Sequence, residues 1–377
     1  QYRLGKSDLP QIKPQMVTMD KKVYSVIVGT GSCVPSRRVM NDDFLNASFY
    51  DGNGERLKKE NRETIDKLAE ITGIRERRYL ADGQVSSDLG FLAAEDALRS
   101  SGIDRETLDY IIVAHNVGDV RPGVVRSDII PSLATRIKHK LRIANPRTVC
   151  YDIVFGCPGW LQGVIQADYY IRSGDSRRVM VIGSETLSRA SDPHDRDSMI
   201  YADGAGATIL EARASEAPVG ILSHVARTDS FDHAFMLWMA KSNDPGHQGD
   251  ELYIKMDGHK LYEYAVKTVP LVVKESVEKA GLAIGDIKKV LIHQANEKMD
   301  EAIVKRLFKL CGGVYRSEVM PMIISWLGNS SVATVPTLLD LILKGKLEDH
   351  ALAPGDHIVL ASVGAGMNIN SVVYRLP

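Results

Sequence analysis

The chain has 377 residues, of which 44% are hydrophobic and 25% charged, and its formal net charge is −1. These values fit an ordinary globular protein with a large core, and so small a charge creates no bulk attraction to nucleic acid or to an anionic membrane. No apolar run reaches the ~20 residues that a membrane-spanning helix needs. The four cysteines, Cys33, Cys150, Cys157 and Cys311, lack CxxC spacing, which argues against a disulfide framework or a zinc ribbon and favours a reduced, cytoplasmic setting.

Residues 1–18 are polar and precede Met19, and we interpret them as a leader or an expression remnant outside the fold. After them, short β-rich runs alternate with amphipathic stretches. The pattern predicts strands over residues 24–28, 110–114, 148–153, 179–182, 207–210, 290–292, 358–361 and 371–374. It predicts helices over residues 87–100, 160–173, 261–280 and 298–310, and the charged run 55–60 is interpreted as a solvated helix face. This alternation indicates an α/β protein with mainly buried strands.

The second half of the chain echoes the first. Residues 108–115 resemble residues 287–293, and downstream of each lies a small-residue turn, at 156–159 and at 328–331, that leads into a helix and a further strand. We therefore expect two duplicated α/β halves, residues 19–214 and 215–377, joined through the polar, turn-rich stretch 211–218.

Cys157 is the most informative residue. It follows an apolar strand, sits between Gly156 and Pro158, and precedes a helical pattern. A thiol at a helix N-terminus is stabilised as a thiolate by the unpaired amides and the helix dipole, which makes it a nucleophile. The competing interpretation is a small buried cysteine, a frequent role for this residue type.

His293 and Asn329 also occur where strands end and helices begin. A histidine at the carboxyl end of a strand points into the crevice where α/β sheets bind ligands, although a hydrogen-bonded structural histidine is the alternative. For Asn329 the alternative is a helix N-cap. Only the coincidence of all three residues, each at such a junction, favours a shared site over three separate structural roles.

Taken together, these motifs resemble the β-ketoacyl-acyl carrier protein synthase III family of the thiolase superfamily, over nearly all of residues 19–377. The supporting motifs, in chain order, occupy residues 27–32 with Pro35, 72–77, 156–159, 181–186, 201–207, 293–296, 328–331 and 364–366. The resemblance implies a thiolase-like fold with two duplicated halves in an α-β-α-β-α arrangement, and a homodimer.

The resemblance also implies roles for individual residues. Cys157 would take an acyl group from a thioester. His293 with Asn329 would bind the carbonyl of the second substrate, a malonyl-type or β-ketoacyl thioester, and stabilise its enolate after decarboxylation. The backbone N–H groups of Cys157 and Ala365 would form the oxyanion hole. The family's coenzyme A and pantetheine contacts match Arg196, Ala295 and Asn296. Its carrier-protein contact and its acyl-pocket residue match Lys298 and Ile130. No metal and no bound cofactor are implied.

The sequence departs from the family in three places. Lys67 and Ile71 replace the tryptophan and arginine that sandwich the adenine of coenzyme A, so we expect greater reliance on an acyl carrier protein. The stretch 115–130 is longer and ends with Ile130 in place of a bulky aromatic residue, which suggests a primer other than acetyl. Extra length around Cys311 has no functional interpretation.

Two other sequence patterns give weaker indications of function. Gly29 and Gly31 follow a strand, but a third glycine is missing and Pro35 interrupts the expected helix, which excludes a dinucleotide site. The acids and histidine of residues 192–197 are interpreted as a solvated turn rather than a metal site.

Two rival functions remain: an acyltransferase on the same fold without decarboxylation, and an inactive partner subunit of a synthase. A hydrolase is disfavoured because no Gly-x-Ser-x-Gly elbow is present.

Overall fold

The computed structural model describes residues 22–124 and 126–377, so the expected leader, residues 1–18, lies outside the described residues. The strands are β1 (Lys22–Cys33), β2 (Arg37–Met40), β3 (Glu76–Tyr79), β4 (Tyr110–Ala114), β5 (Val149–Ile153), β6 (Arg178–Thr186), β7 (Asp203–Ser215), β8 (Gly220–Thr228), β9 (Leu237–Ala240), β10 (Tyr253–Met256), β11 (Ile287–Ile292), β12 (His357–Gly364) and β13 (Asn368–Arg375). The α-helices are α1 (Asn61–Thr72), α2 (Ser86–Ser101), α3 (Leu133–Lys140), α4 (Gly159–Ser173), α5 (Ser230–His233), α6 (Gly258–Lys279), α7 (Glu297–Leu310), α8 (Ile324–Leu327) and α9 (Thr334–Leu343).

Two large sheets share one topology. The five-stranded sheet has the order β1-β7-β6-β4-β5, and the four-stranded sheet has the order β11-β12-β13-β8. In the first sheet, β7 is antiparallel to both β1 and β6, while β6 is parallel to β4. In the second, β13 is antiparallel to both β8 and β12, while β12 is parallel to β11. The four strands of the second sheet therefore repeat four of the five strands of the first, and β5 has no counterpart among them. The chain passes between the sheets over residues 216–219, so the linker is shorter than the expected 211–218, because residues 211–215 belong to β7.

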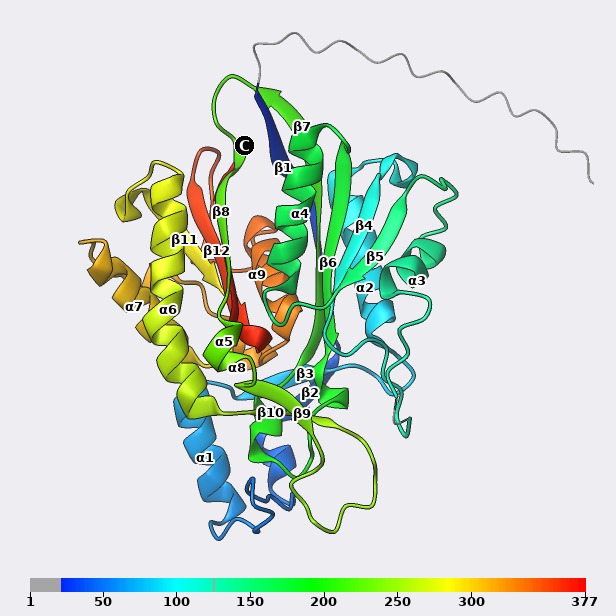
Figure 1. Cartoon of the computed structure of the whole chain (residues 1–377), viewed down its shortest axis with the longest axis vertical. Coiled ribbons are helices and arrows are strands. Elements are labelled where there is room, and N and C mark those ends of the chain that lie inside the picture. Colours follow the sequence, from blue (N-terminus) through cyan, green and yellow to red (C-terminus); the bar gives the residue numbers. More distant parts are fainter. Residues whose placement is uncertain (1–21, 125) are drawn as a thin grey trace, which may run out of the picture.

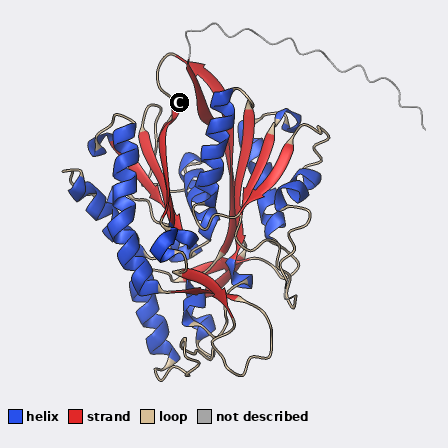
Figure 2. Ribbon diagram, viewed as in Figure 1, coloured by secondary structure: helices blue, strands red, loops and turns tan. Residues whose placement is uncertain are grey.

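Helices separate and cover these sheets (Figure 1). α4 and α9 lie between the two sheets and pack against strands of both. α2 and α3 cover the outer face of the first sheet, and α6, backed by α7, covers the outer face of the second. This is the expected thiolase-like arrangement of α-β-α-β-α layers, which Figure 2 shows as alternating helices and strands. Each layer buries its apolar residues against the next, and the side chains of α4 and α9 form one continuous core between the sheets.

The eight expected strands and the four expected amphipathic helices are present, several of them longer than predicted. The interpretation of residues 55–60 as a helix face is wrong. That segment is irregular: Arg56 forms a bridge with Tyr50, and the amide of Leu57 donates to the carbonyl of Phe49. The helix begins only at Asn61, whose side chain donates to the carbonyls of Leu45 and Ala47.

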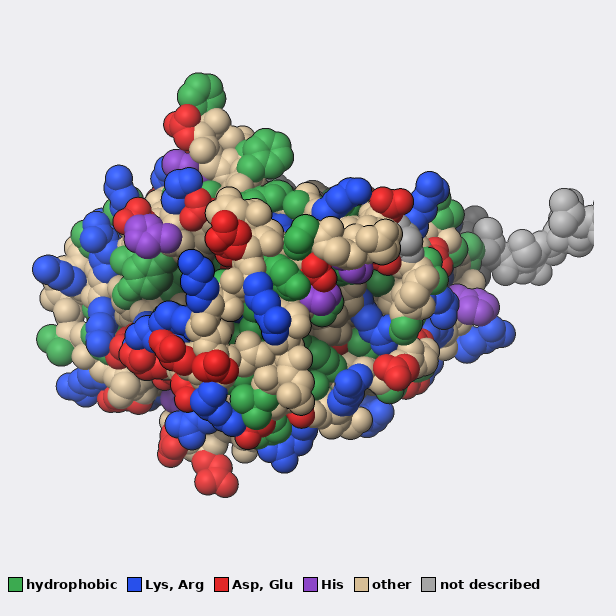
Figure 3. Space-filling view, turned by 90° about the horizontal axis from the view of Figure 1, so that it is seen from below, with side chains coloured by type: hydrophobic (Ala, Val, Ile, Leu, Met, Phe, Trp, Pro, Cys, Tyr) green, Lys and Arg blue, Asp and Glu red, His purple; other side chains and the backbone are tan. Residues whose placement is uncertain are grey.

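The face of the described residues that Figure 3 shows carries no field of a single sign. Basic and acidic side chains are intermixed over the face seen in Figure 3, with hydrophobic side chains between them. Among the described residues, no helix combines the length and apolar character needed to cross a bilayer.

Candidate active site

One cavity of about 1070 Å³ is lined by most of the site residues predicted from the sequence. Cys157, His293 and Asn329 all line it. Its inner end is built from segments that directly follow β4, β5, β11 and β12, where loops from both halves of the fold meet. Its outer walls come from α1, the β9–β10 hairpin and the start of α6. These walls are mainly apolar, with contributions that include Leu68, Ile71, Trp238, Met239, Ile254, Met256 and Tyr262.

Cys157 sits in the expected turn between β5 and α4, two residues before the first helical residue, Gly159. Gly156 before it has φ +67°, a left-handed conformation that glycine adopts without strain. The turn packs tightly on the second half of the chain, since a Cβ at Gly156 would lie 2.7 Å from the amide nitrogen of Ala365. This close packing therefore fixes Cys157 at the interface between the two halves of the chain.

The expected stabilised thiolate is not what this environment favours. Burial raises the pKa of the Cys157 thiol to about 11, and the nearby carboxylate of Glu185 acts in the same direction. The hydroxyl of Ser331, which donates to Cys157 Sγ at 3.4 Å, opposes that rise. Desolvation outweighs the helix N-terminus here, so the resting sulfur is protonated at neutral pH.

His293 follows β11 and is held through its backbone, whose N–H donates to the carbonyl of Ala361 at 2.9 Å. Burial lowers the pKa of its imidazole to about 4, so the ring is neutral at physiological pH. Its Nδ1 is buried and has no hydrogen-bond partner, which argues against the structural histidine and leaves Nε2 as the nitrogen that can serve the cavity. The next residue, Gln294, anchors the loop by bonding the backbone of Pro321 and Ile323.

Asn329 is fixed at three atoms. Its N–H donates to the carbonyl of Ile200 and its carbonyl accepts from the N–H of Ala202. Its side-chain oxygen accepts from the N–H of Ser331 at 2.9 Å. That last bond resembles the capping role considered as an alternative, but it also settles the orientation of the amide. The NH₂ group of Asn329 is left as a donor in the cavity wall.

The glycine-rich turn after β12 completes the inner end of the cavity. A Cβ at Gly364 would lie 2.4 Å from the backbone nitrogen of Cys157, so this backbone approaches Cys157 as closely as only glycine permits. Ala365 also lines the cavity. The turn thus brings the two N–H groups assigned to an oxyanion hole, those of Cys157 and Ala365, into one neighbourhood.

The residues expected to contact the thioester carrier lie farther out. Arg196, Ala295 and Asn296 line the cavity. The side chain of Arg196 is 58% exposed and lies 3.9 Å from Asp197. The side chain of Asn296 is engaged as the N-cap of α7, where it accepts from the N–H of Met299 at 3.1 Å. Asn296 can therefore offer a carrier its NH₂ group, whereas its oxygen is occupied.

Two predicted site residues do not line the cavity. Ile130 is 85% exposed in the single chain. Its loop is closed by backbone bonds between Asp119 and Asp128 and is clamped by Arg136 of α3, which bonds both carboxylates. Lys298, at the start of α7, is 55% exposed and forms an ion pair with Glu70 of α1 at 3.2 Å. Glu70 also pairs with Lys67, so the position aligned with the family's adenine sandwich carries a surface ion-pair network.

The interpretation of residues 192–197 as a solvated turn is wrong, because Asp192 is buried and the acids of this turn bond other parts of the protein. Asp192 accepts from Lys255, Ser242 and the N–H of Asn243. Over residues 22–124 and 126–377, no group of three His, Cys, Asp or Glu side chains is arranged to hold a metal ion.

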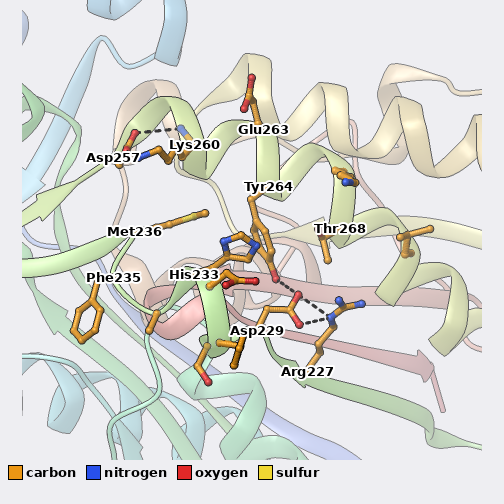
Figure 4. A pocket seen from close by; sticks show the side chains of 16 residues that line it. Arg227, Asp229, His233, Phe235, Met236, Asp257, Lys260, Glu263, Tyr264 and Thr268 are labelled. Atoms are coloured by element: carbon orange, nitrogen blue, oxygen red, sulfur yellow. Dashed lines mark hydrogen bonds and ion pairs between the residues drawn. The ribbon is translucent and has the colours of Figure 1, made fainter.

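A second hollow, of about 870 Å³, lies beside the first, between α5 with its flanking loop and α6. Figure 4 shows that its central charged groups bond to one another. Asp229 accepts from both Arg227 and Tyr264, and Lys260 pairs with Asp257. None of the predicted site residues lines it.

Sequence reasoning missed three polar residues around Cys157. Asn116 lies just after β4, Glu185 lies near the end of β6, and Ser331 lies two residues after Asn329. Glu185 and Ser331 fall inside the family motifs, and Asn116 stands at a strand end. Their positions in the sequence marked them as possible site residues, but nothing in the sequence indicates that the three side chains contact one another.

The fold and the site define a thiolase-like enzyme that transfers acyl groups and condenses them. Two models of one family match the chain: 3-oxoacyl-[acyl-carrier-protein] synthase III over residues 151–230, and its C-terminal domain over residues 277–376. The chain belongs to this family.

Solved structures agree with that assignment. The 3-oxoacyl-(acyl carrier protein) synthase III of Pseudomonas aeruginosa PAO1 is 25% identical, with a TM-score of 0.77 over 94% of this chain and 98% of that one. The enzyme of Aquifex aeolicus VF5 is 28% identical, with a TM-score of 0.74 over 93% and 99%. The priming β-ketosynthase of the R1128 polyketide biosynthetic pathway is 25% identical, with a TM-score of 0.76 over 97% and 99%.

Proposed function

We propose that the protein catalyses a decarboxylative Claisen condensation between an acyl group carried on Cys157 and a malonyl-type thioester. The observation that carries this proposal is the shared cavity, which receives a thiol, a neutral imidazole and an amide donor whose orientation is fixed. A neutral histidine and an asparagine suit enolate stabilisation, because both can donate to a developing oxyanion without removing a proton.

In the first half-reaction, Cys157 Sγ attacks the carbonyl carbon of an acyl thioester. The carbon–sulfur bond of the donor breaks, the thiol proton passes to the departing sulfur, and the acyl group stays on Cys157. The N–H groups of Cys157 and Ala365 stabilise the tetrahedral oxyanion.

In the second half-reaction, the extender loses carbon dioxide, and the electron pair of the broken carbon–carbon bond forms an enolate bound by His293 and Asn329. The enolate carbon attacks the acyl carbonyl, a new carbon–carbon bond forms, and the thiolate of Cys157 departs and takes one proton from solvent. The atoms balance with no metal or redox cofactor, so thioesters of phosphopantetheine or coenzyme A suffice as substrates.

An acyl carrier protein is the proposed donor or extender carrier. Arg196, Ala295 and Asn296 lie where a pantetheine arm would enter, and Lys298 stands next to this entrance on the surface. Lys67 and Ile71 offer no aromatic ring on which an adenine could stack, which supports a preference for the carrier protein over free coenzyme A.

A cytoplasmic homodimer is the proposed assembly. β5 ends the first sheet, and its outer edge pairs with no other strand in the described part of the chain. An unpaired edge of this kind is a ready template for a second copy. The exposed Ile130 near this side is then available to reach the partner's acyl pocket.

The test is acyl loading followed by intact-mass analysis. Wild-type protein and Cys157→Ala are incubated with acyl-carrier-protein and acyl-coenzyme A donors of several chain lengths, and carbon dioxide is then measured after a malonyl thioester is added. Adducts on wild type alone, followed by carbon dioxide release and a β-ketoacyl product, are expected.

The rival functions give different results. Acyl transfer to an oxygen or nitrogen nucleophile without carbon dioxide release would favour the non-decarboxylating acyltransferase. If no donor loads Cys157, the condensation is refuted and the inactive partner subunit is favoured.

A further inference from the structure

A chain of hydrogen bonds connects the sulfur of Cys157 to a buried carboxylate. The hydroxyl of Ser331 donates to Cys157 Sγ at 3.4 Å. The side-chain amide of Asn116 donates to Ser331 Oγ at 3.1 Å and to Glu185 Oε2 at 2.6 Å. The backbone N–H of Asn116 also donates to Glu185 Oε2, at 3.0 Å. Glu185 and Ser331 are buried, so water does not compete freely for these groups.

The donors in this chain set its direction. Both protons of the Asn116 amide are used, one on Glu185 and one on Ser331 Oγ. Because Ser331 Oγ accepts from Asn116, the single proton of its own hydroxyl is free to point at Cys157. Glu185 accepts from both the backbone nitrogen and the side-chain nitrogen of Asn116. These two bonds fix the orientation of the side-chain amide that supplies the protons.

The backbone at Ser331 is held in an unusual conformation. Its φ is +53°, in the left-handed region that a serine adopts only at a cost. The same residue uses its N–H to hold the side-chain oxygen of Asn329 at 2.9 Å. One strained residue therefore contacts both the acyl-bearing sulfur and the donor assigned to the enolate.

We propose that Ser331 is a positioning residue that activates Cys157 through its hydroxyl and orients Asn329 through its amide, with Asn116 and Glu185 aiming the hydroxyl. The inference rests on the proposed function for its catalytic meaning, whereas the hydrogen bond to sulfur can be tested without any acyl substrate. The bond favours the charged sulfur as the thiol proton leaves, because a donor next to a thiolate opposes the desolvation that burial imposes.

The experiment measures the rate at which iodoacetamide alkylates Cys157 between pH 7 and pH 9.5, by peptide mass mapping against Cys157→Ala. Ser331→Ala removes the hydroxyl and keeps the backbone N–H. Ser331→Gly does the same and also relieves the positive φ, so it carries the test if the alanine variant folds poorly. Ser330→Ala is the matched control, because Ser330 bonds Thr334 rather than the sulfur.

Both Ser331 variants are expected to alkylate about tenfold more slowly than wild type at each pH, as the loss of a hydrogen bond to a charged group predicts. Asn116→Ala should slow the reaction less, and Ser330→Ala should leave it unchanged. Wild-type rates in both Ser331 variants would overturn the proposal, as would a wild-type Cys157 that does not react by pH 9.5. The two proposals can fail separately. If the Ser331 variants alkylate more slowly but the wild-type protein releases no carbon dioxide, the condensation is refuted and the activation of Cys157 by Ser331 is still supported.

Discussion

The side-chain oxygen of Asn329 accepts a hydrogen bond from the backbone N–H of Ser331 at 2.9 Å. This contact separates two properties of the asparagine, its orientation and its ability to donate. Asn329→Asp keeps an oxygen for Ser331 but loses the NH₂ group, whereas Asn329→Ala loses both.

We expect both Asn329 variants to retain acyl loading of Cys157 and to lose decarboxylation by about 10²- to 10³-fold, the usual effect of removing one oxyanion donor. Intact-mass analysis and carbon dioxide release measure the two steps separately. Substantial decarboxylation by Asn329→Asp would show that donation by this amide is not required.

The buried imidazole of His293 predicts a pH dependence of stability. Its pKa is lowered by burial from 6.5 to about 4, so the unfolded chain binds the proton more tightly. The contribution of the neutral His293 imidazole to the free energy of unfolding is complete above pH 6.5 and is lost as the pH falls toward 4. At pH 5 the loss from this group is about 2 kcal/mol.

Urea unfolding at pH 7 and pH 5 measures this effect. The difference in unfolding free energy between the two pH values should be about 2 kcal/mol smaller in His293→Asn than in wild type. His259→Asn, which removes an exposed histidine of α6, should behave as wild type. Equal pH differences in wild type and His293→Asn would mean that His293 titrates normally.

Lys298 is expected to contribute to recognition of the carrier protein. Lys298→Ala should raise KM about fivefold for carrier-protein thioesters and leave coenzyme A thioesters unaffected, because only the protein surface reaches this position. Lys305→Ala is the matched control: it lies farther along α7, has nearly the same exposure and also pairs with a glutamate. An equal effect of both substitutions would exclude a specific contact at Lys298.

Ile130 is predicted to limit the acyl chain of the partner subunit. Light scattering should give a mass near twice the 41.5 kDa of the chain. Ile130→Trp should shorten the longest acyl group that loads Cys157, because the larger ring fills more of the pocket. Ile129→Trp, a substitution at the exposed neighbour, should not. A monomer, or unchanged chain-length preference in Ile130→Trp, would contradict this role.

Gly31 of β1 predicts a stability effect far from the cavity. A Cβ there would lie 2.2 Å from the carbonyl oxygen of Ala93 and 2.4 Å from the amide nitrogen of Ala97, both in the backbone of α2. Neither atom can move without displacing the helix, so Gly31→Ala should cost roughly 3 kcal/mol or more. Gly83→Ala meets no atom within 4 Å and should change stability by less than about 0.5 kcal/mol. Denaturant unfolding of both variants measures the two changes in unfolding free energy.

The sequence predicted the parts of this fold that depend on local pattern. Strand ends are visible as apolar runs that stop at small or polar residues, which is how Cys157 and His293 could be placed in one crevice. The expected strand end at Asn329 is wrong, because Asn329 follows the short helix α8, and the family resemblance was needed to assign it to the same site. The α/β class followed from the alternation of strands and helices, and the two halves followed from their repeated order. The layered α-β-α-β-α arrangement was expected only from the family resemblance.

Pairings between distant segments could not be predicted. Residues 55–60 have helical composition, yet the segment is irregular because its backbone pairs with residues 49–51. Lys298 pairs with Glu70, far away in the chain, and Ser331 meets Cys157 across the seam of the halves. The raised pKa of Cys157 depends on the same tertiary burial, which a helix N-terminus read from sequence does not reveal.

The protonated state of Cys157 has a consequence for the durability of the enzyme. Peroxides and other cellular oxidants attack thiolates far more readily than thiols. A sulfur whose pKa is raised by burial to about 11 offers them little thiolate between turnovers. An environment that keeps the resting sulfur protonated therefore also limits its irreversible oxidation.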